Sequence, residues 1–377
     1  MFTPTEEQQL LKDMIRKFTE QEVAPFISEW EEKGEFARHV FDKLGELGFC
    51  GMTISEEYGG GGLDYLTLAM IVEEMTTVTG LGISYLAVHL AAATPIEAFG
   101  TEGQKDKYLV PLATGKALGA FAITEPNAGS DVAAIRTTAV QEGDHYALNG
   151  TKTFITNAKE ADIYLVMAKT NKKSGHKGIS AFIVEKGTPG MEFGQKEKKM
   201  GLTYIPTRDV IFEDCKVPVA NRVDEENEGF KVAMYTLDGS RISVAAAATG
   251  LGQAALNAAI NYAKERHAFG QPIAGFQALQ FMMADMATEI QAARLLTYQA
   301  GSMKDQGMDI SIQASMAKRY ASDTAMKVTT DAVQILGGYG YMKEYNVERY
   351  MREAKLMQIV EGTSQIQRLV IAAKLLA

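Results

Sequence analysis

A glutamate close to the C-terminus has the setting of a catalytic base. Glu361 is followed by Gly362, which permits an unusual backbone conformation, and residues 364–367 read SQIQ, the pattern of a helix capping box. The carboxylate would therefore project from just outside a helix N-terminus, beside the apolar Ile359 and Val360. Burial would raise its pKa while the helix dipole lowers it, and a substrate that expels water would favour the range of a general base. The alternative is a glutamate that only stabilises the helix start.

A second segment offers a cradle for an anionic or carbonyl-rich ligand. Residues 121–131 read FAITEPNAGSD, in which proline, asparagine and glycine let the backbone bend and expose N–H groups. Thr124 and Ser130 add hydroxyl donors. The alternative is an ordinary turn at the end of a strand.

Two other places carry informative side chains. In FITN, residues 154–157, strand alternation puts Phe154 and Thr156 on the same side; the alternative is a core phenylalanine and a surface threonine. Arg266 follows a long predicted helix, and its planar guanidinium group can donate two parallel hydrogen bonds to an anionic ligand. Without such a ligand it is a solvated helix end.

Signatures of several other chemistries are absent from the sequence. It contains no GxGxxG after a strand, no Walker GxxxxGK[ST] and no GxSxG. The histidines are far apart and form no HxxxH pair, so no local metal motif exists and we expect no metal.

The elements that must position these residues form three blocks. Helical periodicity, opened by a capping box at Thr5 to Gln8, fills residues 1–116. Short runs of β-branched and aromatic residues follow over 117–224, and their spacing favours an antiparallel sandwich or barrel. Long helical blocks return over 225–377, at about 225–266, 276–305, 309–336, 343–355 and 364–376. We therefore predict an α+β fold that is mainly α: an N-terminal helical domain, a middle antiparallel β-sandwich or barrel domain and a C-terminal four-helix bundle.

Composition excludes several classes of protein. The 377 residues are 46% hydrophobic and 23% charged, as in an ordinary globular protein. The formal charge of −9 argues against nucleic acid as a partner. We expect Cys50 and Cys215 to be buried thiols, because no CxxC and no secretory leader is present. No membrane span is expected, and we predict a cytoplasmic protein, or an organelle-matrix protein if the chain is a processed form.

Four segments together resemble the signatures of the acyl-CoA dehydrogenase family. They are FAITEPNAGSD at 121–131, ERHAFGQPI at 265–273, DAVQILGGYG at 331–340 and IVEGTSQIQ at 359–367. The resemblance covers essentially the whole chain, in the family's order and layout. It implies FAD as the cofactor and desaturation of an acyl-CoA thioester between its α and β carbons as the reaction.

The resemblance also assigns roles to individual residues. Glu361 would take the α-proton, and the β-hydrogen would pass as hydride to flavin N5. The FAD-binding residues would be Phe121, Ile123, Thr124, Gly129, Ser130, Phe154, Thr156, Arg266, Phe269, Gln277, Gln334, Gly337, Gly338, Thr363 and Gln365. The substrate would meet Ser130, Asp238, Arg241, Val360 and Gly362. Thr156 would face flavin N5, and the main-chain N–H of Glu361 would hold the thioester carbonyl together with a ribityl hydroxyl of FAD.

Partners follow from the same resemblance. Arg266, Phe269 and Gln277 match positions that reach the FAD of a neighbouring subunit, which implies an oligomer: a dimer, or a homotetramer built as a dimer of dimers. Reduced FAD would pass electrons to an electron-transferring flavoprotein.

The sequence departs from its relatives at informative positions. Phe154 stands where the family usually has tryptophan, and Val360 where short- and medium-chain members commonly have tyrosine. Some relatives carry the base at the position of Ser240, which has no carboxylate, and this strengthens Glu361. For Arg241 a buried structural ion pair with Asp238 is the alternative to a substrate role.

The acyl pocket is expected to draw its floor from the helix that contains Tyr85 to Ile96. We read His89 within it as an ordinary packed histidine, and Gly80 to Leu90 contains no arginine for a distal carboxylate, so a neutral acyl chain is preferred. An acyl-CoA oxidase and a non-catalytic acyl-CoA- or flavin-binding protein are the competing functions.

Overall fold

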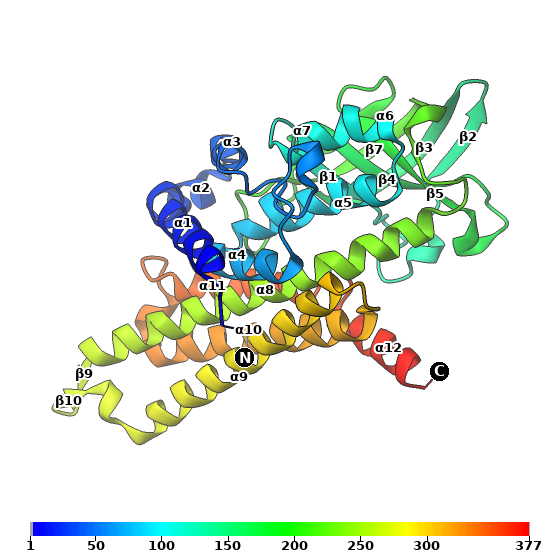
Figure 1. The fold of residues 1–377 in the computed structure, drawn as a ribbon. Coiled ribbons are helices and arrows are strands. Elements are labelled where there is room, and N and C mark those ends of the chain that lie inside the picture. The colour runs from blue at the N-terminus through cyan, green and yellow to red at the C-terminus, as the bar shows by residue number, and fades with distance from the viewer. Residues whose placement is uncertain (1–2, 377) are drawn as a thin grey trace.

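Helices and one large sheet make up the computed structural model, which describes residues 3–376 (Figure 1). The helices of the first part are α1 (Glu6–Glu22), α2 (Ile27–Lys33), α3 (Arg38–Glu46), α4 (Tyr65–Met75), α5 (His89–Phe99), α6 (Glu102–Gln104) and α7 (Val110–Ala113). The strands that follow are β1 (Gly119–Ala122), β2 (Thr138–Glu142), β3 (His145–Thr156), β4 (Ile163–Lys169), β5 (Ile179–Glu185), β6 (Met191–Phe193), β7 (Thr207–Pro218) and β8 (Arg222–Val223). The last part holds α8 (Gly229–Glu265), β9 (His267–Ala268), β10 (Gln271–Pro272), α9 (Gln277–Asp305), α10 (Ser311–Leu336), α11 (Val347–Met357) and α12 (Ser364–Leu375).

The first helix begins where the sequence predicts. Thr5 accepts a hydrogen bond from the N–H of Gln8, and the Gln8 side chain accepts one from the N–H of Thr5, so the predicted capping box is confirmed. The helix expected to contain Tyr85 to Ile96 is interrupted, because residues Ile83–Val88 form a π-helical segment, η2, before α5 begins. Both stretches are buried almost throughout. The predicted pocket floor is therefore a core helix with a local change of winding.

The sheet is mostly antiparallel, with strand order β6-β7-β3-β2-β4-β5-β8. One part of the expectation is wrong: β1 pairs with β4 in parallel, with Gly119 opposite Ile163 and Ala122 opposite Val166. All four residues of β1 are buried, so the strand has no alternation of buried and exposed side chains that could have indicated its orientation. We keep 1–116, 117–224 and 225–377 as the proposed domain bounds.

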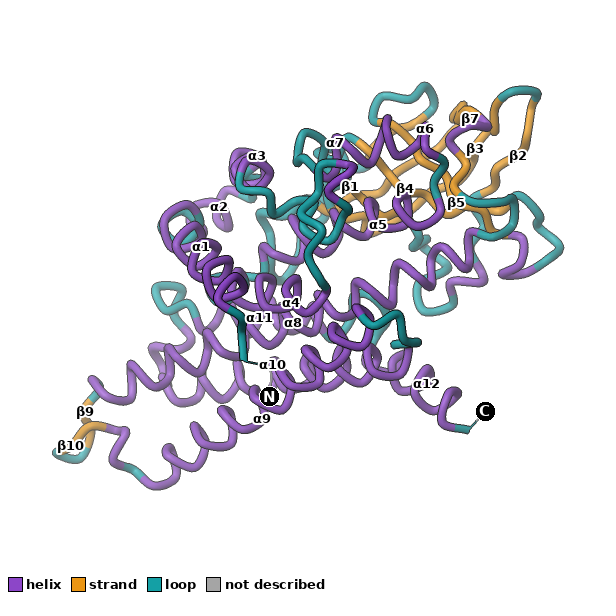
Figure 2. Tube along the Cα trace, viewed as in Figure 1, coloured by secondary structure: helices purple, strands orange, loops and turns teal. Residues whose placement is uncertain are grey.

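Small side chains let the long C-terminal helices approach closely. The buried run Ala245–Ala248 of α8 lies among core residues that include Ala314, Ala317 and Ala321 of α10, and α8 packs against α9, α10 and α4. In Figure 2 the strands gather at one end of the molecule, and only the short β9–β10 hairpin lies at the opposite end. Within residues 3–376 no helix is long and apolar enough to cross a membrane.

Both cysteines are buried and unpaired, as predicted. Burial raises the pKa of the Cys50 thiol to about 12 and that of Cys215 to about 11, so both remain protonated thiols at neutral pH.

Candidate active site

Glu361 lies in the short connection between α11 and α12, in a backbone conformation that is unusual for its residue type. Its φ is 54°, and that of Gly362 is 90°, so two consecutive residues occupy the left-handed region. The φ of Gly362 favours glycine, and a Cβ atom there would also come within 2.7 Å of Nε2 of Gln367. A non-glycine residue in this region costs about 1–3 kcal/mol, and such strain is typical of functional sites.

The helix after this connection begins at Ser364, the first residue of the predicted helical block, but its capping residue differs from the expected one. The hydroxyl of Thr363 accepts the N–H of Ile366 at 3.2 Å and caps α12. The capping box expected at Ser364 to Gln367 is therefore wrong: the hydroxyl of Ser364 donates to Asp323 instead. Threonine and serine are both good N-caps, so their order alone did not decide between them.

The carboxylate of Glu361 faces α8. The hydroxyl of Ser240 donates to its Oε2 at 2.9 Å. Burial raises the pKa of Glu361, while this hydrogen bond and the positive charges of Arg241 and Lys318 act in the opposite direction. A raised pKa is the property that the sequence analysis required of a base.

Arg241 forms the buried ion pair that the sequence allowed as an alternative. Its Nη1 lies 2.7 Å from Oδ1 of Asp238, whose other oxygen accepts the hydroxyl of Ser311 at 2.8 Å. The Nε of Arg241 also donates to the main-chain carbonyl of Glu361 at 3.3 Å. The arginine therefore holds the backbone at Glu361.

Two side chains that the sequence analysis did not select hold the same connection. Gln367 donates through Nε2 to the carbonyl oxygens of Glu361 and Gly362, at 3.0 and 2.9 Å. Lys318 of α10, fully buried, donates to the Gly362 carbonyl at 2.7 Å. A signal was present, because Lys318 follows Ala314 and Ala317 on a stripe of small residues that must face the core.

The turn after β1 is held in place by a buried ion pair between Glu125 and Lys152. The carboxylate of Glu125 accepts Nζ of Lys152 at 2.7 Å and the N–H of Thr137 at 2.9 Å, and Lys152 also donates to the carbonyl of Ile123 at 3.1 Å. Burial lowers the pKa of Lys152 to about 8. The turn therefore leaves its outer residues, Gly129 and Ser130, exposed.

Phe154 is an exposed aromatic residue at a break in β3. The pairing of β3 with β7 shifts between Lys152 and Ile155, which marks a β-bulge, and Phe154 has a φ of 57° and is 64% exposed. Ile155 is buried and Thr156 half-buried, so Phe154 and Thr156 are the more exposed pair. The N–H of Thr153 donates to the carbonyl of Thr124 at 2.8 Å, which joins this segment to the turn after β1.

A second group of predicted cofactor residues lies around the C-terminal end of α8. A hollow of about 500 Å³ at the C-terminal end of α8 is lined by Tyr262, Arg266, Ile273, Ile335, Leu336, Gly337, Gly338, Tyr339 and Met342. The Arg266 guanidinium lies 5.6 Å from the centre of the Tyr339 ring. Gln277 and Gln334 are exposed and lie close in sequence to the lining residues Ile273 and Ile335. Phe269 is 94% exposed at the tip of the hairpin.

This hollow and the base connection occupy different parts of one helix. Ser240 lies in the first half of α8 and Arg266 at its end; at about 1.5 Å per residue the two are roughly 40 Å apart. Figure 1 shows the β domain and the β9–β10 hairpin at opposite ends of the molecule. One protomer therefore does not bring all the predicted cofactor residues together.

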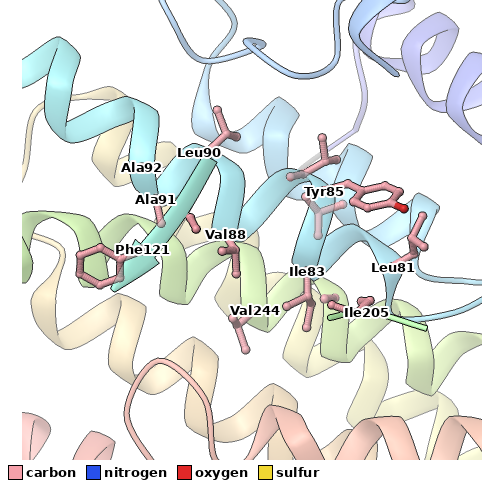
Figure 3. Packing of buried hydrophobic residues seen from close by; sticks show 14 of the residues in the cluster. Leu81, Ile83, Tyr85, Val88, Leu90, Ala91, Ala92, Phe121, Ile205 and Val244 are labelled. Carbon is pink, nitrogen blue, oxygen red and sulfur yellow. The ribbon is translucent and has the colours of Figure 1, made fainter. Parts of the chain in front are cut away.

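Apolar side chains from η2, α8 and β1 belong to one buried cluster. Figure 3 shows Ile83 and Val88 of η2 with Val244 of α8 and Phe121 of β1 in one buried cluster. Val244 is one helical turn from Ser240, so this cluster continues from the Glu361 site.

His89 is a packed histidine, as predicted. Its Nε2 lies 3.1 Å from the carbonyl oxygen of Leu112, and its Nδ1 accepts the N–H of Gly119 at 3.0 Å. Burial lowers its pKa to about 4, so it is neutral at pH 7. Among residues 3–376 no cluster of histidine, cysteine and carboxylate side chains is arranged to hold a metal ion.

Models of three protein domains match the chain in order. They are the N-terminal, middle and C-terminal domains of acyl-CoA dehydrogenases, over residues 5–116, 120–215 and 227–376. A short-chain-specific acyl-CoA dehydrogenase of Clostridium acetobutylicum is 48% identical over 375 residues, 99% of each chain. A subunit of the caffeyl-CoA reductase–Etf complex of Acetobacterium woodii is 47% identical over 374 residues, also 99% of each.

Solved structures show the same similarity. The butyryl-CoA dehydrogenase of Megasphaera elsdenii aligns over 100% of both chains with a TM-score of 0.98 and 47% identity. A chain from a structure described as an electron transferring flavoprotein of Acidaminococcus fermentans is 55% identical, with a TM-score of 0.98 over 100% of this chain and 99% of that one.

Proposed function

The chain belongs to the acyl-CoA dehydrogenase family, and from this membership we propose that Glu361 removes the α-proton of an acyl-CoA thioester. The protein is an FAD-dependent enzyme that acts on CH–CH groups. The single observation that carries the proposal is the Glu361 carboxylate, which has a raised pKa and sits on a backbone held by side chains from three helices.

The chain's own groups explain how the proton is taken. Glu361 must be ionised to accept it, and the Ser240 hydroxyl and the two nearby cations keep an ionised population in spite of burial. We assign the main-chain N–H of Glu361 to the thioester carbonyl, where it would stabilise the charge that develops on the carbonyl oxygen. Ser130, Asp238, Arg241, Val360 and Gly362 complete the proposed substrate site, in which Asp238 and Arg241 are already paired with each other.

The exposed groups of the β domain fit a flavin. Phe154 presents an aromatic ring to solvent, Thr156 is accessible beside it, and a Cβ at Gly129 would meet nothing within 4 Å. When bound, FAD supplies a two-electron acceptor. In this proposal it is held from the same subunit by Phe121, Ile123, Thr124, Gly129, Ser130, Phe154, Thr156, Thr363 and Gln365.

The hollow at the end of α8 fits the other portion of a cofactor bound by a second copy. Gly337 and Gly338 leave open space, since a Cβ at either would meet nothing within 4 Å, and Arg266 supplies a fork for phosphate. The separation along α8 supports the assignment of Arg266, Phe269, Gln277, Gln334, Gly337 and Gly338 to a neighbouring subunit's FAD. We propose a homotetramer, a dimer of dimers, on this basis.

A short, uncharged acyl chain is the proposed substrate. The relatives named above include a short-chain-specific dehydrogenase and a butyryl-CoA dehydrogenase, and Ile83, Val88 and Val244 are packed closely near the site.

An electron-transferring flavoprotein is the proposed acceptor, supported by the Etf complex of one relative. Relatives named as reductases favour a second candidate, the reverse reaction, in which Glu361 returns the proton. We place the protein in the cytoplasm.

The experiment is an anaerobic titration of the FAD-loaded protein with butyryl-CoA, followed by the flavin absorbance. Glu361→Gln is expected to abolish bleaching while FAD and ligand remain bound, and the exposed Glu192→Gln is the matched control. Bleaching by the Glu361→Gln protein would refute the base assignment. Rapid reoxidation by air would favour the acyl-CoA oxidase, and a wild-type protein that binds but never bleaches would favour the non-catalytic binding protein.

A further inference from the structure

We propose that Lys318 is a positioning residue for the Glu361 base, an inference that rests on the function proposed above. Its ammonium group holds the carbonyl oxygen of Gly362, directly after the base, and its positive charge acts on the Glu361 carboxylate. Lys318 touches neither substrate nor cofactor in this proposal and acts through the connection between α11 and α12.

The surroundings of Lys318 are unusual for a lysine. The side chain is completely buried, and its ammonium group donates a hydrogen bond to a neutral carbonyl oxygen, that of Gly362, at 2.7 Å. Within the described chain, no carboxylate oxygen lies within 4.0 Å of its Nζ. A buried ammonium group without a contacting counter-ion is costly, so a merely structural role is poorly served by lysine at this position.

The connection that Lys318 holds contains a strained residue, Glu361. Glu361 and Gly362 are both left-handed, and their two carbonyl oxygens accept hydrogen bonds from three different helices. Arg241 comes from α8, Lys318 from α10 and Gln367 from α12. Contacts from independent directions are what keep a strained conformation in place. Loss of one should loosen the direction of both the carboxylate and the N–H of Glu361.

Lys318 and Arg241 differ in the carboxylates that surround them. On α8, Arg241 is paired with its own carboxylate, Asp238, at 2.7 Å. On α10, Asp323 lies near Lys318 but accepts Arg368 at 2.9 Å. Glu361 is therefore the carboxylate whose charge acts most strongly on Lys318.

The coupling has a definite sign. Burial lowers the pKa of Lys318 to about 8 and raises that of Glu361, and each group's charge opposes the shift of the other. Removal of the ammonium charge should raise the pKa of Glu361 further. Since the base must be ionised, the acid side of the pH profile should then move to higher pH.

Proton removal can be measured separately from electron transfer. 3-Thiabutyryl-CoA has α-hydrogens but a sulfur atom in place of the β-carbon, so deuterium uptake from D2O, followed by mass spectrometry against pH, reports the base alone. Lys318→Met and Lys318→Gln are expected to move the acid midpoint up by about one pH unit. For the Met variant the plateau rate should also fall about tenfold or more, because the base is less well oriented.

Two further variants separate position from charge. Gln367→Leu removes a carbonyl donor without a change of charge, so the plateau should fall while the acid midpoint stays in place. Lys196→Met is the matched control: the Lys196 ammonium also holds a glycine carbonyl, that of Gly34, and burial also lowers its pKa, but it does not contact the base connection. This variant should leave both midpoint and plateau unchanged.

The outcomes distinguish the two proposals. If Glu361→Gln abolishes deuterium uptake while both Lys318 variants keep the wild-type midpoint, the role of Lys318 is overturned and the base assignment stands. Uptake at the wild-type rate by Glu361→Gln overturns both. FAD content and the circular dichroism spectrum establish that each variant is folded, and the Gln variant decides the question should the Met variant not fold.

Discussion

The hydroxyl oxygen of Ser240 lies 2.9 Å from Oε2 of Glu361, although the two residues are separated by 121 positions in the chain. Ser240 is the position at which some relatives of this family were expected to carry the base. The two positions therefore face the same space from different elements, one from α8 and one from the connection before α12. A carboxylate attached at either backbone position is within reach of the same proton.

We predict that the base can be moved between these positions. Glu361→Gly should be inactive, and the added change Ser240→Glu should restore a measurable fraction of single-turnover flavin reduction, on the order of one part in a hundred, because the new side chain is not held in place. Ser240→Gln in the same background is the control and should restore none. A double variant that binds FAD yet is as inactive as Glu361→Gly would contradict the shared position.

The buried ion pair under the cofactor turn should matter for stability and for FAD. Lys152→Met leaves Glu125 charged and buried, so the free energy of unfolding should fall by about 3–5 kcal/mol and the affinity for FAD should drop. The double variant Glu125→Gln with Lys152→Met should recover more than half of the stability. Denaturant unfolding and FAD titration measure these effects. The exposed Lys186→Met should leave both within error.

His89 should make stability depend on pH below neutrality. Its folded pKa, about 4, lies below its ordinary value of 6.5, so the neutral form is favoured in the fold. Its contribution is therefore fully present above pH 6.5 and is lost as the pH falls toward 4, by about 3 kcal/mol in total. The difference in unfolding free energy between wild type and His89→Gln should shrink over this range.

Arg266 should act on the cofactor of another subunit. Arg266→Gln alone should lose FAD, and Glu361→Gln alone should keep FAD but not turn over. Refolded mixtures of these two variants should regain activity, since one site of a mixed pair contains both wild-type residues. A mixture of Arg266→Gln with the doubly substituted chain should regain none. Failure of the first mixture, with assembly shown by light scattering, would assign Arg266 to its own subunit.

The sequence predicted much of this site because the informative residues are close together in the chain. Glu361, Gly362 and the following helix lie within a few positions of each other, and local rules of capping and backbone freedom apply to them directly. The error at Ser364 has the same origin, because Thr363 satisfies those rules equally well.

The parts that the sequence analysis missed depend on contacts over long distances. Lys318 and Gly362 are 44 positions apart, and nothing near Lys318 in the chain indicates that its partner is a carbonyl oxygen. The parallel pairing of β1 was missed for a similar reason, since it is set by β4 and not by any pattern within β1. Residue type and periodicity indicate which face is buried, but not which distant atom meets it.

The π-helical segment Ile83–Val88 bears on how this family can change over evolutionary time. Such a segment amounts to a regular helix with one extra residue taken up in a single turn. A one-residue deletion there would restore ordinary winding and change the side chains of that turn alone, because the wide turn already absorbs the extra residue and keeps the helix on either side in register, with no loop altered. A helix in the core, normally the part of a protein least tolerant of insertions and deletions, thus becomes a place where a single codon gained or lost can reshape the wall beside the base.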